Sequence, residues 1–189
     1  MPSIIQTDRI DNQAGSTTFL NNGTLSNLTF PTGHIIQTIA DTSVPSSEVT
    51  IGSTFDDYLG ANLQVTITPK ATGNLLLISC FICETYNSAG TNYGLNAGFK
   101  YDASFSSGST LIGPREAIAG HNTMLGTDKN LINNLYYCIQ VVVGTNAPSA
   151  GSASIIRPFF SREAGDVGIN ANGASHGVNT LYVQEIQQW

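Results

Sequence analysis

Strand-like alternation of apolar and polar residues is the clearest pattern along this chain. Within residues 63–68, Leu63, Val65 and Ile67 alternate with polar positions, which predicts a strand with one buried face and one face toward water. Pro69 follows directly. We expect it to end the strand, because proline has no N–H to donate to a sheet ladder.

Two longer runs are apolar on both faces. Residues 74–84 and 134–144 carry aliphatic, β-branched or aromatic side chains at most positions, which is typical of central strands covered on each side. Shorter runs bounded by turn-forming residues predict further strands. These runs are residues 34–40, 49–51, 152–160 and 179–188, with a weaker candidate at 93–102.

The strand pattern predicts the fold class. About eight or nine short strands, separated by loops rich in Gly, Asn and Ser, indicate an all-β protein with a β-sandwich or jelly-roll-like head domain. A helix is expected only as a single turn within residues 113–120, where Pro114 suits a first helical position and Gly120 would end the turn.

The first 33 residues differ from the rest because their apolar residues are scattered among Asn, Gly, Ser and Thr. Such a segment cannot bury a core by itself. We therefore expect residues 1–33 to form an extended N-terminal arm that anchors the chain on a partner or another copy, and residues 34–189 to form the head. The alternative is an edge strand of the head. The residues expected to dock the arm are Ile4, Ile5, Ile10, Phe19, Leu20 and Leu25.

Charge is sparse and acidic. Charged residues make up 11% of the chain, against about 25% in an ordinary soluble domain, so the surface must consist mainly of uncharged polar groups. The net charge is −6, and no two of the seven basic residues are adjacent. Nucleic acid is therefore a poor partner, because it requires a clustered basic face. The pattern of a signal peptide or a membrane span is not seen, so no membrane partner is expected.

The three cysteines are Cys80, Cys83 and Cys138. An odd number in a chain of this size indicates folding in a reducing compartment. Cys80 and Cys83 have C-x-x-C spacing but lie within a predicted strand, where they would point to opposite faces, and a second ligand pair is missing. We interpret both as buried structural thiols, and expect no metal and no cofactor.

Catalytic motifs are not evident. His34, His121 and His176 are widely spaced and lie in no recognised catalytic pattern. Asp56 and Asp57 are interpreted as solvated loop acids, because the spacing of a calcium loop is missing. We therefore expect a protein that is not an enzyme. The loops are the candidates for recognition on a rigid scaffold, and the residues proposed for it are Asn87, Asn92, His121, Asn172 and His176.

Four segments together resemble a known family. They are "SIIQTDRIDNQAGSTTF" at the start, "GTLSNLTFPTGHIIQT" at the join of arm and head, "VTITPKATGNLLLIS" in an apparent hairpin, and "NTLYVQEIQ" near the end. In outline they are similar to small structural proteins of tailed bacteriophages, including those of cyanobacteria. The resemblance implies a virion-exposed β-sandwich, trimeric and anchored by its arm, with no catalytic residues to carry over.

Three functional hypotheses follow from the pattern and the resemblance together. The first is a capsid decoration or cement protein, docked on the major capsid protein or another virion protein and assembled in the host cytoplasm. The second is a tail-fibre or receptor-binding tip whose loops recognise host cell-surface glycan. The third is a carbohydrate-active enzyme, in which amide substitution of a loop acid such as Asp57 or Glu163 would abolish turnover.

Overall fold

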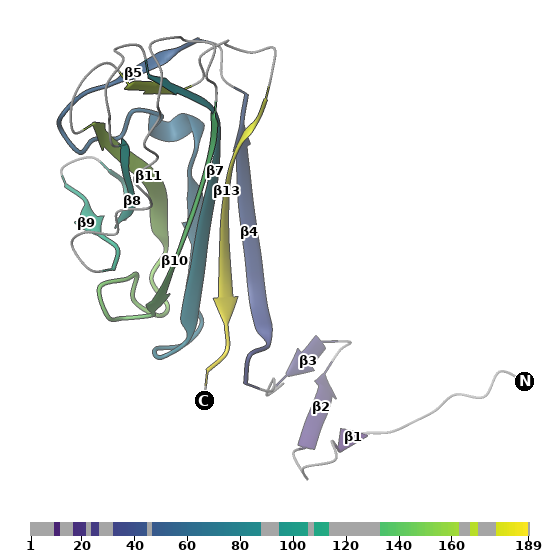
Figure 1. Ribbon diagram of the computed structural model, residues 1–189. Helices are drawn as coiled ribbons and strands as arrows, with labels where there is room; N and C mark the ends of the chain where they lie inside the picture. Colours follow the sequence, from purple (N-terminus) through teal and green to yellow (C-terminus); the bar gives the residue numbers. More distant parts are fainter. Residues whose placement is uncertain are drawn as a thin grey trace, which may run out of the picture.

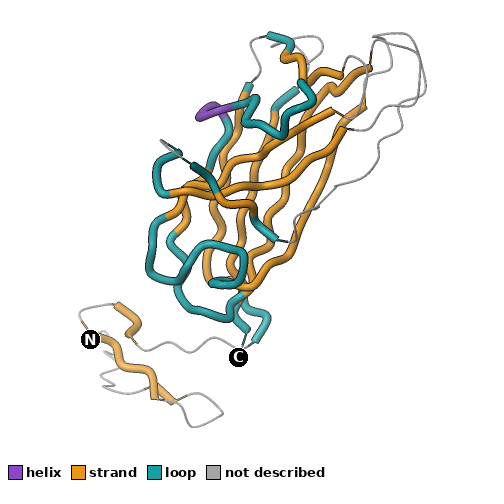
Figure 2. The backbone as a smooth tube through the Cα atoms, turned by 90° about the vertical axis from the view of Figure 1, so that its left-hand side faces the viewer, coloured by secondary structure: helices purple, strands orange, loops and turns teal. Residues whose placement is uncertain are grey.

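The head consists of two antiparallel β-sheets packed face to face (Figure 1). The structure is a computed structural model, and it describes residues 10–11, 17–21, 24–26, 32–44, 47–87, 95–105, 108–113, 133–162, 167–169 and 177–188. Figure 2 shows the strands running along the length of the head, with a short helical turn near one end. That turn is the 3₁₀ helix η1 (Gly60–Asn62).

The first sheet is built around the longest strand. β7 (Leu75–Asn87) lies between β13 (Asn179–Ile186) and β10 (Asn133–Val142), and β4 (Ile35–Ser43) pairs with the other edge of β13. Two short strands extend this sheet at one end. They are β12 (Val167–Ile169), which pairs with the end of β7, and β5 (Val49–Ile51), which pairs with β12.

The second sheet has the order β6-β11-β8-β9. Its members are β6 (Val65–Ile67), β11 (Ser154–Arg162), β8 (Leu95–Asp102) and β9 (Thr110–Leu111). The topology is clearest when eight strands are renumbered from one to eight in chain order, namely β4, β6, β7, β8, β9, β10, β11 and β13. The first sheet then has the order 1-8-3-6, and the second sheet has the order 2-7-4-5. This interleaving of two Greek keys is a jelly roll, so the predicted fold class is confirmed.

The core lies between the two sheets. The inward residues of β7, among them Ile78 and Cys80, are fully buried against side chains of the second sheet such as Phe99 and Phe160. Tyr137 of β10 stacks on Phe99 with ring centroids 4.7 Å apart. Burial of each large apolar side chain stabilises the fold by about 1.5–3 kcal/mol, and the alternating pattern of the sequence is what delivers these side chains to one face.

Most of the expected strands are observed with shifted ends. Residues 49–51 form β5 as predicted, and the weak candidate at 93–102 is β8. The short strands β9 and β12 were not predicted, because two or three residues give too little periodicity. Of the helical turn expected at 113–120, residues 114–120 lie outside the described part of the chain.

The prediction for residues 74–84 is correct in part. β7 is central, with neighbours along both edges. Its outer face is nevertheless only half-buried, since Leu75, Leu77 and Phe81 are of intermediate exposure. The expected cover on both faces is therefore incomplete within a single chain.

The interpretation of residues 65–79 as a hairpin is wrong. β6 pairs with β11 in the second sheet, whereas β7 belongs to the first sheet. The intervening turn therefore carries the chain from one sheet to the other. A fully buried carboxylate, that of Glu185 on β13, accepts hydrogen bonds from the backbone N–H groups of Lys70 and Ala71 in this turn, and these bonds hold the turn against the first sheet.

The arm contains three short strands. β1 (Ile10–Asp11), β2 (Thr17–Asn21) and β3 (Thr24–Ser26) pair antiparallel with one another as a separate sheet. Among the strands that the structure describes, none of these three joins either sheet of the head.

Candidate functional site

The head has two distinct ends, and the arm leaves from one of them. The Gly33 N–H donates to the Gln187 carbonyl at 2.7 Å, and the Gln187 N–H donates to the His34 carbonyl at 2.8 Å. Next to them, Ile35 at the start of β4 pairs with Ile186 at the end of β13. We call this the proximal end of the head, because the chain enters it directly from residues 1–33 (Figure 1).

The opposite end, here called the distal end, is where several other strands begin or finish. β10 begins where Asn133 pairs with Thr85, and Val167 of β12 pairs with Asn87, the last residue of β7. In the second sheet, Leu95 at the start of β8 pairs with Arg162 at the end of β11. Segments 88–94 and 163–166 each join two of these termini, whereas segment 114–132 adjoins this end only at the start of β10, because Gly113 before it donates to the Asn146 carbonyl beyond the other end of β10.

Of the predicted recognition residues, Asn87 is the one that the structure describes. It ends β7 at the distal end of the head. Asn92, His121, Asn172 and His176 lie outside the described residues, within segments 88–94, 114–132 and 170–176. Those segments adjoin β7, β10 and β12 at termini located at the distal end. The assignment of these residues to recognition stays a prediction.

The predicted docking residues of the arm divide in a similar way. Ile10 lies in β1, Phe19 and Leu20 in β2, and Leu25 in β3, so the strand pairing brings them into one small sheet. Ile4 and Ile5 lie outside the described residues. Their docking role stays a prediction.

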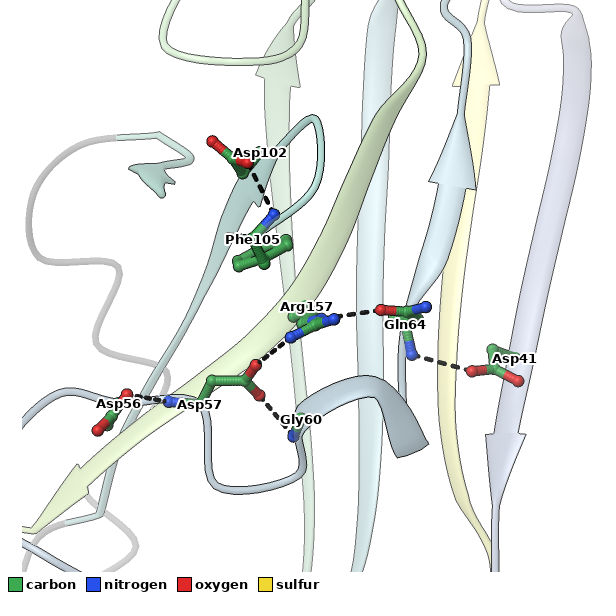
Figure 3. A network of polar contacts seen from close by, with 8 residues as sticks. All are labelled: Asp41, Asp56, Asp57, Gly60, Gln64, Asp102, Phe105 and Arg157. Atoms are coloured by element: carbon green, nitrogen blue, oxygen red, sulfur yellow. Dashed lines mark hydrogen bonds and ion pairs between the residues drawn. The ribbon is translucent and has the colours of Figure 1, made fainter. Parts of the chain in front are cut away.

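A polar network covers the outer face of the second sheet (Figure 3). Arg157 on β11 forms an ion pair with Asp57, with Nη1 and Oδ2 2.8 Å apart and side chains only 15% and 13% exposed. Its Nε donates to the side chain of Gln64 at 2.8 Å, and the Gln64 backbone N–H donates to Asp41 of β4 at 2.9 Å. The network thus links the loop before η1 to strands of both sheets.

The expectation that Asp57 is a solvated loop acid is wrong. Its second oxygen accepts a hydrogen bond of 2.7 Å from the Gly60 N–H at the start of η1. The loop folds back onto the sheet and carries the carboxylate to Arg157, and a charge that is partly buried in this way requires such a partner. Asp56 beside it is exposed, as expected.

Aromatic rings and cations pack together beside this network. The Nζ atom of Lys100 lies 4.4 Å from the ring centroid of Phe159 and 5.4 Å from the ring centroid of Phe55. Phe55 lies directly on Gly98, where a Cβ atom would come within 2.8 Å of the ring. These contacts fasten the loop to the sheet, since a cation over an aromatic face contributes about 0.5–2 kcal/mol.

A tight turn follows β8. The carboxylate of Asp102 accepts hydrogen bonds from the backbone N–H groups of Ser104 at 2.8 Å and Phe105 at 2.7 Å. These two bonds lower the pKa of Asp102 below its ordinary value. The turn places the Phe105 ring 4.4 Å from the guanidinium carbon of Arg157, so the turn supports the same network.

The thiols differ in environment. Cys80 and Cys83 are buried thiols, whereas Cys138 on β10 is exposed. Burial raises the pKa of Cys80 to about 12, partly offset by a hydrogen bond with Tyr137. This supports the interpretation of the C-x-x-C pair as structural thiols. Within the part of the chain that the structure describes, no group of three or more His, Cys, Asp or Glu residues is arranged to hold a metal ion.

Sequence reasoning missed the residues that organise this surface. Arg157 was the available signal, because a charged residue within the apolar run 152–160 needs a partner. Its partner Asp57 is 100 residues away, and only the fold brings the two together. No helix among the described residues is long and apolar enough to cross a membrane.

Comparison with known proteins finds solved structures of low similarity. No protein-family model matches the sequence, and no curated protein is significantly similar to it. A structure of Eiger TNF from S. frugiperda is similar with a TM-score of 0.39 and 10% identity, over 80% of this chain and 94% of that one. The structure of the infectious bursal disease virus Gx strain is similar with a TM-score of 0.37 and 12% identity, over 89% of this chain. The crystal structure of the VP2 subviral particle of that virus is similar with a TM-score of 0.33 and 12% identity, also over 89% of this chain. The chain spans 41% of the length of each of these two viral chains.

Proposed function

We propose that the chain is a non-enzymatic structural protein of a virion, which decorates or cements the capsid. It docks through residues 1–33 on the major capsid protein or another virion protein and exposes the jelly-roll head. The observation that carries this proposal is the polarity of the head. The arm enters at the proximal end, through Gly33 and Gln187, whereas Asn87 and the neighbouring strand termini lie at the distal end.

This arrangement suits anchoring and display. An anchor at one end leaves the opposite end free to face outward, and many copies on a symmetric particle gain avidity without a tight single site. The resemblance of residues 3–19 to the leader of phage virion proteins, and of residues 23–38 to the join between leader and head, supports the same role. We propose that the protein acts as a homo-oligomer, a trimer, without a cofactor, and that it is located in the virion after assembly in the host cytoplasm.

Binding to capsids tests the proposal. Purified capsids that lack the protein would be mixed with the full-length chain, with a Phe19→Asp, Leu20→Asp variant of β2, and with a Thr66→Asp control on an exposed position of β6. The wild type and the control should sediment with capsids, and the arm variant should stay in solution. The strand signal in the circular dichroism spectrum of this variant should match that of the wild type, which shows that the head is folded. Equal binding by all three would overturn docking through the arm.

A receptor-binding tip is the second candidate. The specific observation in its favour is that the segments carrying Asn92, His121 and His176 adjoin strand termini at the distal end. Loops gathered at one end of a rigid scaffold are a common arrangement for recognition. In this case the chain should bind host cells and host surface glycan and ignore capsids. The same samples, incubated with cells and with capsids in parallel, separate the two functions.

A further inference from the structure

The outer face of the first sheet is built from four cross-strand rows. Strand register fixes each row, because residues that pair directly across a ladder point to the same side. From the proximal end, the rows are Ile35, Ile186, Leu75 and Val142; Thr38, Gln184, Leu77 and Gln140; Ala40, Tyr182, Ser79 and Cys138; and Thr42, Thr180, Phe81 and Tyr136. We call this surface the uncharged face.

None of these rows contains a charged residue. Among the charged residues of these strands whose side chains the structure describes, Asp41 and Glu185 make their bonds on the inner side, where Asp41 accepts from the Gln64 N–H and Glu185 is fully buried. On the second sheet, the ion pair of Arg157 with Asp57 and the neighbouring Lys100 lie on the outer face, on the opposite side of the head. The two outer faces of the sandwich therefore differ sharply in charge.

The exposed large apolar residues of the described chain gather on this same face. Four of them lie in the rows, and Val44 and Val178 continue the alternation just beyond the ends of β4 and β13. They are 40–66% exposed, with Tyr136 at the upper limit. An apolar patch of this kind, with aromatic residues and depleted of charge, has the composition of an interface core. The complete set is Ile35, Val44, Tyr136, Val142, Val178 and Tyr182.

We infer that the uncharged face is the surface through which copies of this chain associate with one another. This deepens the proposed function: it rests on the part in which the chain acts as an oligomer, and is independent of the virion protein to which the arm docks. The strand β7 is apolar on both faces, yet within one chain only its inner face is fully covered. A second copy supplies the missing cover.

Charge favours a second copy as the occupant. Each chain carries a net charge of −6, so two copies repel each other unless they meet where charge is missing. The uncharged face meets that condition on every copy, and the same face turned inward from three copies gives the closed symmetry of the proposed trimer. A partner of opposite charge would instead be expected on the ionic side of the head.

The size of the face is sufficient. Four strands spaced about 4.8 Å apart, each contributing about eight residues at 3.3 Å, give a surface of about 19 Å by 26 Å. Contact over this surface covers roughly 500 Å² on each copy, and thus roughly 1,000 Å² for a pair of copies, which is the lower limit for a specific interface.

A charge placed in the centre of the face tests the inference. Tyr182 lies on the middle strand β13 and is 46% exposed, so Tyr182→Lys should leave the fold intact and place a charge without a partner in the contact between copies. Thr66→Lys, at an exposed position of β6 on the other sheet, is the matched control. We expect light scattering to give the mass of an oligomer for the wild type and the control, and the 20.0 kDa mass of a single chain for Tyr182→Lys.

Cys138 gives a second measurement that needs no disruptive variant. It is the exposed cysteine and lies in the same row as Tyr182, whereas Cys80 and Cys83 are buried. Alkylation of Cys138 should be slow in the concentrated wild-type protein and at least tenfold faster after dilution or in Tyr182→Lys. The rate in Thr66→Lys should follow that of the wild type.

Each other outcome overturns the inference in a recognisable way. A wild-type monomer at all concentrations, with a freely reactive Cys138, removes association altogether. An oligomer that persists in Tyr182→Lys with Cys138 still reactive shows that a different surface joins the copies. If the wild type is a monomer that binds capsids and Tyr182→Lys fails to bind them, the face takes a virion protein instead. Capsid binding through the arm is scored separately, so its failure leaves this test unaffected.

Discussion

The carboxylate of Glu185 on β13 accepts a hydrogen bond of 2.6 Å from the side-chain amide of Asn74, which lies 111 residues earlier in the chain. Glu185 is fully buried, and it also accepts bonds from the backbone N–H of Lys70 at 2.8 Å and the side chain of Gln37 at 2.5 Å. All of these partners donate, so a buried acceptor is fully supplied with donors. This single side chain ties the turn that joins the two sheets to β13.

Glu185→Gln should therefore destabilise the head. The amide group of glutamine would direct its own N–H toward donors, which leaves buried groups without partners. We expect the free energy of unfolding in urea to fall by about 2–4 kcal/mol. Lys70→Ala is the control, because its backbone N–H is retained and its side chain is exposed. A loss in Glu185→Gln no larger than in this control would contradict the role assigned to Glu185.

The ion pair between Arg157 and Asp57 should be coupled energetically. Both side chains are largely buried, so the pair is shielded from the screening that weakens surface salt bridges. A double-mutant cycle with Asp57→Asn and Arg157→Gln should give a coupling energy of about 1–2 kcal/mol in urea unfolding. A cycle of Arg157→Gln with Thr66→Ala, which lies on the same sheet and makes no bond to Arg157, should give none. Additive losses in the first cycle would count against a structural ion pair.

Asp102 should contribute a dependence on acid pH. Backbone N–H groups of Ser104 and Phe105 lower its pKa in the folded chain, so its stabilisation is present above the ordinary pKa of about 3.9 and is lost as pH falls through the lowered value. Asp102→Asn keeps a side-chain oxygen for the turn but does not titrate. The wild type and this variant should converge in stability as pH falls below about 4, measured by urea unfolding. A constant difference at all pH values would show that the turn does not favour the charged form.

Cys80 should produce the opposite dependence at alkaline pH. Its pKa is about 12 in the folded chain because of burial, whereas an unfolded thiol ionises near pH 8.5. Ionisation thus favours the unfolded state, and stability should decline from about pH 8.5 upward. In a Cys138→Ser background, Cys80→Ala should reduce this decline between about pH 8.5 and pH 10, below the range in which unfolded tyrosine ionises. An unchanged slope would mean that Cys80 is not the group responsible.

Local pattern was enough to place most strands of the head. The alternation around Val65 and the apolar run through Ile78 both predict strands that the structure contains. Periodicity reports which side of a strand is buried, and this information is local. It does not report the neighbour of a strand, and for this reason the segment from Val65 to Ser79 was taken for a hairpin although its two strands lie in different sheets.

The sequence by itself determined an all-β head, its central strand and a surface with little charge. Tertiary structure alone decided that Asp57 meets Arg157, that Glu185 holds the turn at Lys70, and that the uncharged rows of β4, β13, β7 and β10 share one face. The physical reason is the range of each effect. Side-chain alternation acts between neighbours in the chain. The ion pair of Arg157 with Asp57 and the hydrogen bond of Asn74 with Glu185 join residues 100 and 111 positions apart. Such contacts, like the register of the strands, follow only from the packing of the whole chain.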